Sequence, residues 1–116
     1  MQYALLIYED EAATGKAQET DAFKAHKAQH MAFAGDLSGK GVMRGGAGLK
    51  DTASATSVRL KQGAHTVHDG PFAEAKEQLG GFYVVEASDL DEAIALAKRV
   101  PLTDGGCIEV RPLLPM

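Results

Sequence analysis

Two histidines and one aspartate are the side chains whose types and spacing best suit chemistry in this sequence. His26 and His30 are four residues apart, and Asp69 opens the run Asp69–Phe82, which reads DGPFAEAKEQLGGF. A histidine titrates near neutral pH, and a carboxylate beside it can fix its tautomer and raise its basicity. We therefore predict a catalytic pair in which His30 is the general base and Asp69 orients it.

A metal site and a purely structural role are the alternatives for these residues. The spacing of the two histidines places both imidazoles on one helix face, where Asp69 could complete a set of two histidines and one carboxylate. Alternatively, a histidine on an apolar helix stripe is a hydrogen-bonded core or interface residue. We favour proton transfer that needs no metal and no cofactor.

Four further side chains are candidates for contact with a substrate: His26, Phe72, Glu74 and Lys76. Glutamates such as Glu74 are also common on solvated helix surfaces, and Lys76 can pair with a neighbour one turn away. The glycines between Gly35 and Gly48 match neither nucleotide-binding fingerprint. We predict a helix end and then a flexible loop there, which could act as a lid.

A long helix must position His30. Thr20 is a suitable N-cap before Asp21, and the helix is predicted to run to about Lys40. At about 100° per residue, one stripe of this helix collects both histidines together with apolar residues. The stripe consists of Phe23, His26, His30, Phe33, Ala34 and Leu37. It predicts that both histidines face the interior.

A hairpin must position Asp69. Its strands are predicted at Thr56–Lys61 and Ala64–Asp69, joined by a two-residue turn. In that register Asp69 lies on the same face as Val58 and Val67, which we expect to be the face that the helices cover.

Two more helices are predicted after the hairpin. Pro71 suits the first turn of a short helix that runs to Leu79 and ends at the following glycine pair. Asp89 is the predicted N-cap of the last helix, with Glu92 three residues later as in a capping box. Its apolar stripe is formed by Leu90, Ala93, Ile94, Ala97 and Val100.

The segments Tyr3–Tyr8 and Phe82–Ala87 are apolar on both faces, as is typical of central strands. With the hairpin and a final strand around Ile108, the chain predicts an α+β fold with one antiparallel sheet of about five strands and two helices on one face. The other face would be bare and apolar. A second copy of the chain is therefore expected to cover it, as a homodimer.

The run Asp69–Phe82 resembles the signature of the DGPF-domain proteins, a branch of the YCII-related family. The segments YALLIYEDE, ATSVRL, FYVVEASDLDEAIALAKR and IEVRP are similar to that family too, so the resemblance covers nearly the whole chain. It implies a ferredoxin-like subunit paired into a dimeric α+β barrel, with a proposed His–Asp site. Genes for DGPF proteins often stand beside those for extracytoplasmic-function sigma factors.

Composition narrows the classes of function. A chain of 116 residues predicts a single domain, residues 1–116. A formal charge of −4 without a basic run argues against nucleic-acid and membrane partners. The single cysteine, Cys107, suits a reducing cytoplasm and is expected to be a small buried hydrophobe.

Two classes of function follow. One is a cofactor-independent lyase or isomerase that uses His30 and Asp69 on a small aromatic or carbonyl substrate. The other is a non-catalytic homodimer that binds a small molecule or regulates, with a link to sigma-factor signalling.

Overall fold

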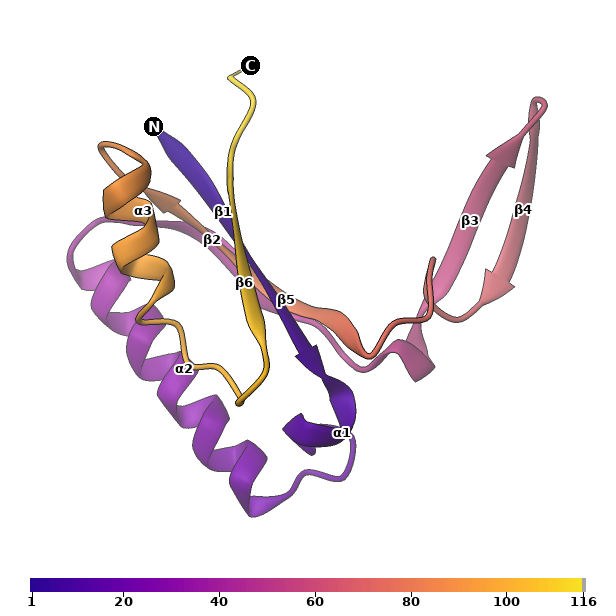
Figure 1. Cartoon of the computed structure of the whole chain (residues 1–116), viewed down its shortest axis with the longest axis horizontal. Helices are drawn as coiled ribbons and strands as arrows, with labels where there is room; N and C mark the ends of the chain where they lie inside the picture. The colour runs from indigo at the N-terminus through magenta and orange to yellow at the C-terminus, as the bar shows by residue number, and fades with distance from the viewer. Residues whose placement is uncertain (116) are drawn as a thin grey trace.

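The computed structural model describes residues 1–115, and its centre is a four-stranded antiparallel sheet in the order β2-β5-β1-β6. These strands are β1 (Gln2–Asp10), β2 (Met43–Gly48), β5 (Glu77–Glu86) and β6 (Cys107–Pro112). The helices α2 (Asp21–Gly39) and α3 (Leu90–Ala97) lie on the same side of this sheet, and the short α1 (Glu11–Thr14) follows β1 (Figure 1). Without the arm described below, the order strand-helix-strand-strand-helix-strand is ferredoxin-like and confirms the predicted fold class.

The hydrophobic core fills the space between the sheet and the two helices. Alternate residues of β1 are buried, and Leu5 and Val85 have no exposed surface. The buried cluster comprises Tyr3, Leu5, Ile7, Phe33, Leu37, Tyr83, Val85, Ala87, Ala93 and Val100. Within residues 1–115, no helix lies over the other face of the sheet (Figure 1), and apolar residues such as Leu6 and Phe82 stay partly exposed.

Both long helices begin where the sequence predicts. The Thr20 Oγ1 accepts the Phe23 N–H at 3.1 Å at the start of α2. The Asp89 carboxylate accepts the Glu92 N–H at 2.9 Å at the start of α3. These caps satisfy N–H groups that have no partner within the helix, which is why both boundaries were predictable.

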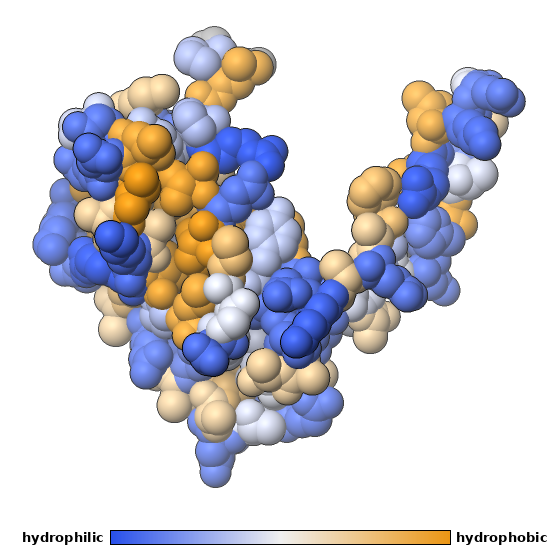
Figure 2. Space-filling model, in the orientation of Figure 1, coloured by the Kyte–Doolittle hydropathy of each residue, from blue (hydrophilic) through white to orange (hydrophobic). Residues whose placement is uncertain are grey.

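The apolar stripe of α3 is only partly buried. Ala93 and Val100 reach the core, whereas Leu90 and Ile94 keep 50% and 36% of their surface exposed. Figure 2 shows apolar side chains gathered over α3 and toward β6 on this face. Cys107 on β6 is also exposed, contrary to the expectation that it is a buried hydrophobe.

The hairpin forms a separate two-stranded sheet that projects from the body (Figure 1). We call β3 (Thr56–Lys61), β4 (Ala64–Asp69) and the turn between them the hairpin arm. The predicted register is confirmed, since Val58 pairs with Val67 and Thr56 with Asp69. The main sheet therefore has four strands rather than about five, and the apolar face of the arm does not face the helices.

Two segments depart from the predicted secondary structure. The glycine-rich segment expected as a flexible loop forms β2, because its backbone pairs with β5 from Met43 to Gly48 without needing side chains. The short helix expected from Pro71 to Leu79 is absent, since the segment bends and joins β5 at Glu77. No helix within residues 1–115 is long and apolar enough to cross a membrane.

Candidate functional site

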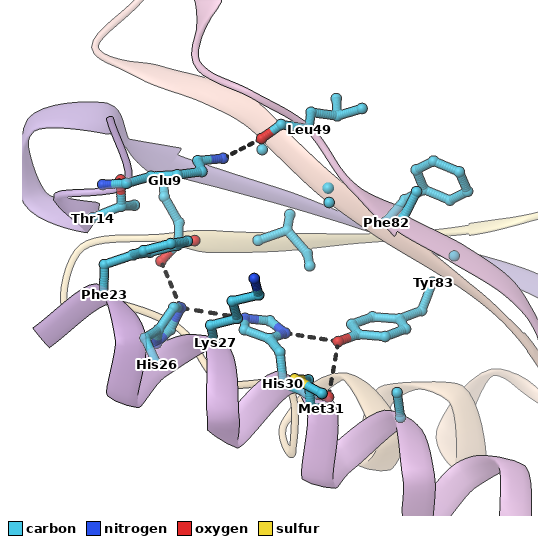
Figure 3. A pocket seen from close by; sticks show the side chains of 18 of the residues that line it. Glu9, Thr14, Phe23, His26, Lys27, His30, Met31, Leu49, Phe82 and Tyr83 are labelled. Carbon is cyan, nitrogen blue, oxygen red and sulfur yellow. Dashed lines mark hydrogen bonds and ion pairs between the residues drawn. The ribbon is translucent and has the colours of Figure 1, made fainter. Parts of the chain in front are cut away.

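A cavity of about 450 Å³ lies between α2 and the helix-facing side of the sheet. Its walls come from β1, α2, β2 and β5, and most of its surface is apolar, including Ile7, Phe23 and Met43. The polar side chains Glu9, His26, His30 and Tyr83 converge on one part of this cavity (Figure 3). Its volume and its largely apolar lining with a few converging polar groups are typical of small-molecule sites.

Glycines on β2 explain why the cavity is open. Gly46 pairs with Tyr83, and a Cβ at position 46 would lie 2.8 Å from the carbonyl oxygen of Phe82. Gly48 pairs with Gly81, and a Cβ at position 48 would meet no atom within 4 Å. At Gly46 and Gly48, the strand that was expected to be a loop therefore contributes only backbone to the cavity wall, which leaves room for a ligand.

The polar residues form a continuous chain of interactions. The Tyr83 hydroxyl lies 2.7 Å from His30 Nδ1, and His30 Nε2 lies 3.2 Å from His26 Nε2. The Glu9 carboxylate is 3.8 Å from His26 Nε2 at the other end (Figure 3). The order Glu9–His26–His30–Tyr83 thus joins a carboxylate, two imidazoles and a phenol.

Glu9 is held firmly although it is an acid in the interior. Only 7% of its surface is exposed, and its Oε2 accepts the Thr103 N–H at 2.8 Å and the Thr103 hydroxyl at 2.7 Å. Burial of a carboxylate is costly unless hydrogen bonds replace its water. The loop before β6 therefore fixes the carboxylate that faces the histidine pair.

The environment keeps the His30 imidazole neutral and the Tyr83 phenol protonated. Burial lowers the pKa of His30, and repulsion from His26 lowers it further, while the charge of Glu9 acts in the opposite direction. Burial raises the pKa of Tyr83. At neutral pH the site thus offers a basic imidazole beside a phenol that can donate a hydrogen bond.

The facing Nε2 atoms of the two histidines share one proton in a hydrogen bond. A hydrogen bond between them requires a proton on one nitrogen and a lone pair on the other. The charge of Glu9 favours a proton on His30, which balances part of the opposing effect of burial and of His26. The arrangement can therefore accept and return one proton.

The structure brings together some of the predicted site residues and separates others. His30 and His26 line the cavity, whereas Asp69 is exposed at the end of β4. Within residues 1–115, the cavity lining includes none of Asp69, Phe72, Glu74 and Lys76. The expected contact between His30 and Asp69 is thus not formed within one subunit, because Asp69 belongs to the arm rather than to the main sheet.

The connection between the arm and β5 carries three of the predicted site residues and lies away from the cavity. Phe72 is 74% exposed, and its ring lies 4.8 Å from the Arg59 guanidinium carbon. It also lines a second hollow of about 630 Å³, together with Leu49 and Leu79. Glu74 and Lys76 are exposed on the same connection. A role for Asp69 and these three residues at a site stays a prediction.

Two site residues, Glu9 and Tyr83, escaped the sequence analysis although a signal for them existed. Glu9 has the same strand parity as Tyr3, Leu5 and Ile7, so the alternation already placed its carboxylate on the buried face. Tyr83 has the parity of Val85 in the same way. A charged or hydroxyl-bearing residue at a buried position was the signal that we missed.

A metal ion is a poorer fit to this geometry. Among residues 1–115, no group of three histidine, cysteine or acidic side chains is arranged to hold a metal ion. The Nε2 atoms of the two histidines face each other at hydrogen-bond distance instead.

Comparison with known proteins identifies a family and one similar protein. A sequence model described as the YCII-related domain matches residues 1–116. An uncharacterized protein of Rhizobium meliloti (strain 1021) is 38% identical over 124 residues, which cover 97% of this chain and 92% of that protein.

Proposed function

The chain belongs to the family of YCII-related domains, and from this premise we propose that it is a cofactor-independent enzyme that moves a proton on a small aromatic or carbonyl compound. The observation that carries the proposal is the Glu9–His26–His30–Tyr83 chain on the wall of a cavity. This reading keeps His30 as the base and assigns the supporting carboxylate to Glu9.

The proposed reaction begins when the Tyr83 hydroxyl turns from His30 Nδ1 to the carbonyl oxygen of the substrate; the freed Nδ1 lone pair then accepts the proton of the C–H next to that carbonyl group, while Nε2–H stays bonded to His26. The charge gained by the pair is stabilised by Glu9, and the Tyr83 phenol donates a hydrogen bond to the enolate oxygen that forms. Return of the proton to another carbon gives an isomerase, whereas its transfer to a leaving group gives a lyase. Neither outcome requires a further reactant.

Hydrogen–deuterium exchange tests the proposal without knowledge of the natural substrate. Acetophenone, cyclohexanone and phenylpyruvate are incubated with the protein in deuterated buffer near neutral pH, and the loss of the proton signals beside each carbonyl is followed by NMR. We expect faster exchange than in buffer for at least one compound. His30→Gln should reduce the acceleration by about 10²- to 10⁴-fold, the usual contribution of a general base.

The matched control is His68→Gln, which alters an exposed histidine of the hairpin arm. This variant should exchange protons like the wild type. If the wild type accelerates exchange for none of the three compounds, the enzymatic proposal fails. The non-catalytic binding or regulatory homodimer would then be the better account.

We also propose that two copies pair through the uncovered face of the main sheet. Leu6 and Val84 lie on that face, where apolar side chains alternate with the core residues. Sedimentation at micromolar concentration should give twice the chain mass, and Leu6→Arg should shift the protein to a monomer. Ala32→Arg on the exposed side of α2 is the control; a monomeric wild type would contradict the pairing.

We further propose that the chain falls in the DGPF branch of the family. Support comes from the run Asp69–Phe72, on the connection between the arm and β5. An alignment of YCII-related sequences should group this chain with those that carry the run. Scattering of such sequences over the whole family would contradict the proposal.

A further inference from the structure

The cavity carries an excess of positive charge although the whole chain is acidic. Its lining includes the ammonium groups of Lys16, Lys27 and Lys50 and, among the acids, only the carboxylate of Glu9. With both imidazoles neutral, the formal charge of the lining is +2, against −4 for the chain. A cavity with such a charge and apolar walls attracts anions.

The lysines of the cavity differ in how they are held. The Lys16 ammonium donates to the Leu49 carbonyl oxygen at 2.5 Å and lies 3.9 Å from Asp51, so it fastens the segment after β2 to the body. Among residues 1–115, neither the Lys27 nor the Lys50 ammonium group forms a hydrogen bond or an ion pair. Figure 3 shows the Lys27 side chain rising from α2 beside His30. Lys27 is thus the cation available to a ligand that reaches the histidine pair.

Within residues 1–115, Glu9 forms no ion pair with this ammonium group; its Oε2 accepts from the two Thr103 donors and faces His26 instead. Phe23 and Met31, two apolar residues of the cavity lining, belong to the same helix as Lys27. A ligand that satisfies both parts has an apolar frame and one anionic group.

We propose that the site selects small carbonyl compounds with an apolar body and one carboxylate, which pairs with the Lys27 ammonium while the acidic C–H faces His30. This inference rests on the proposed function, because it names the substrate class of the same cavity. A carboxylate fits better than a phosphate, since one ammonium group, that of Lys27, lies beside the histidine pair and no arginine fork lines the cavity within the described chain. The ion pair between the ligand carboxylate and Lys27 would orient the carbonyl group of the ligand toward the Tyr83 phenol.

A comparison of phenylpyruvate with its methyl ester tests this selection. The two compounds share the aromatic ring and the ketone and differ in the charge of the acid group. We expect phenylpyruvate to bind about tenfold more tightly, as measured by NMR shifts of the protein, since a hydrogen bond to a charged group contributes on this scale. Lys27→Met should abolish the preference and leave the affinity for the ester unchanged.

Lys24→Met is the matched control, because Lys24 is exposed on α2 and is not part of the cavity lining. It should retain the preference for the acid. Equal affinity of the wild type for the two compounds, or no binding of phenylpyruvate, would overturn the inference.

The two proposals can fail separately. If His30→Gln abolishes exchange while Lys27→Met keeps the preference for the acid, the selection by Lys27 is wrong and the proton transfer stands. If Lys27→Met removes the preference while His30→Gln leaves exchange unchanged, the cavity binds carboxylates but His30 is not its base.

Discussion

The cavity under α2 and the hairpin arm hold their polar side chains in opposite ways. In the cavity, Glu9 is buried and each group of the Glu9–His26–His30–Tyr83 chain contacts the next. On the arm and the connection after it, Asp69, Glu74 and Lys76 are exposed. A tuned pKa requires burial and fixed neighbours, so the difference supports the proposal that the cavity, rather than the arm, is the reactive site.

The arm differs from the body in its packing as well. Val58, Leu60 and Val67 are between 63% and 68% exposed, although a two-stranded ribbon is only marginally stable by itself. The arm is tied at its base, where the Gly70 N–H donates to the Ala55 carbonyl oxygen at 2.8 Å. Its apolar face therefore contributes little to the stability of the fold.

The largest contrast between the two regions should appear in stability. Leu5→Ala removes a fully buried side chain and should lower the free energy of unfolding by about 2–5 kcal/mol. Leu60→Ala on the arm should change it by less than about 0.5 kcal/mol, because that side chain is exposed. Urea denaturation measures both values, and a loss at Leu60 as large as that at Leu5 would contradict the independence of the arm.

A smaller difference in stability is expected between substitutions of two glutamates, one in the cavity and one after the arm. Glu9→Ala leaves the Thr103 donors without their acceptor and should destabilise the fold by about 1–3 kcal/mol. Glu74→Ala removes only an exposed charge and should lie within about 0.5 kcal/mol of the wild type. Equal melting temperatures of the two variants would show that Glu9 is not structurally engaged.

Filling the cavity should affect binding more than folding. Gly48→Leu adds a side chain where no atom lies within 4 Å of the new Cβ, so the fold should be retained. We expect it to weaken binding of phenylpyruvate by about tenfold or more, since the side chain enters the space of the ligand. Gly35→Leu on α2, whose Cβ would also meet no atom within 4 Å, lies outside the cavity lining and should bind normally.

The pH dependence of stability should report the buried imidazole. The pKa of His30 in the fold lies below the ordinary value of 6.5, so the unfolded chain binds more protons just below that pH. The free energy of unfolding should therefore be highest above about pH 6.5 and fall as the pH is lowered toward the His30 pKa in the fold. His30→Gln should flatten this region, and an unchanged pH profile would contradict the burial of His30.

Much of the scaffold was predictable because its signals are local. The Thr20 and Asp89 caps, the stripe of α2 and the register of the hairpin each depend on residues close together in the sequence. The apolar residues on both faces of β1 and β5 also predicted that these two strands are central in the sheet. These features are fixed by periodicity and by turn geometry.

The rest depended on contacts between distant segments. The hairpin register does not determine which sheet the hairpin joins, so Asp69 was assigned to the wrong surroundings. The glycines of β2 gave no apolar pattern, although their backbone pairs with β5. Between Pro71 and Leu79, bends replaced the expected helix, and the Gln78 side chain donates to the Ala75 carbonyl oxygen at 2.9 Å.

Titration of His30 by NMR in the wild type, Glu9→Gln and Asp69→Asn tests the central claim most directly. The charge of Glu9 raises the pKa of His30, so Glu9→Gln should lower that pKa below its value in the wild type. Asp69→Asn should leave it unchanged, because Asp69 lies on the exposed arm. A His30 pKa that falls in Asp69→Asn and stays constant in Glu9→Gln would contradict the assignment of Glu9 as the carboxylate partner of His30. Asp69 on the arm would then be that partner.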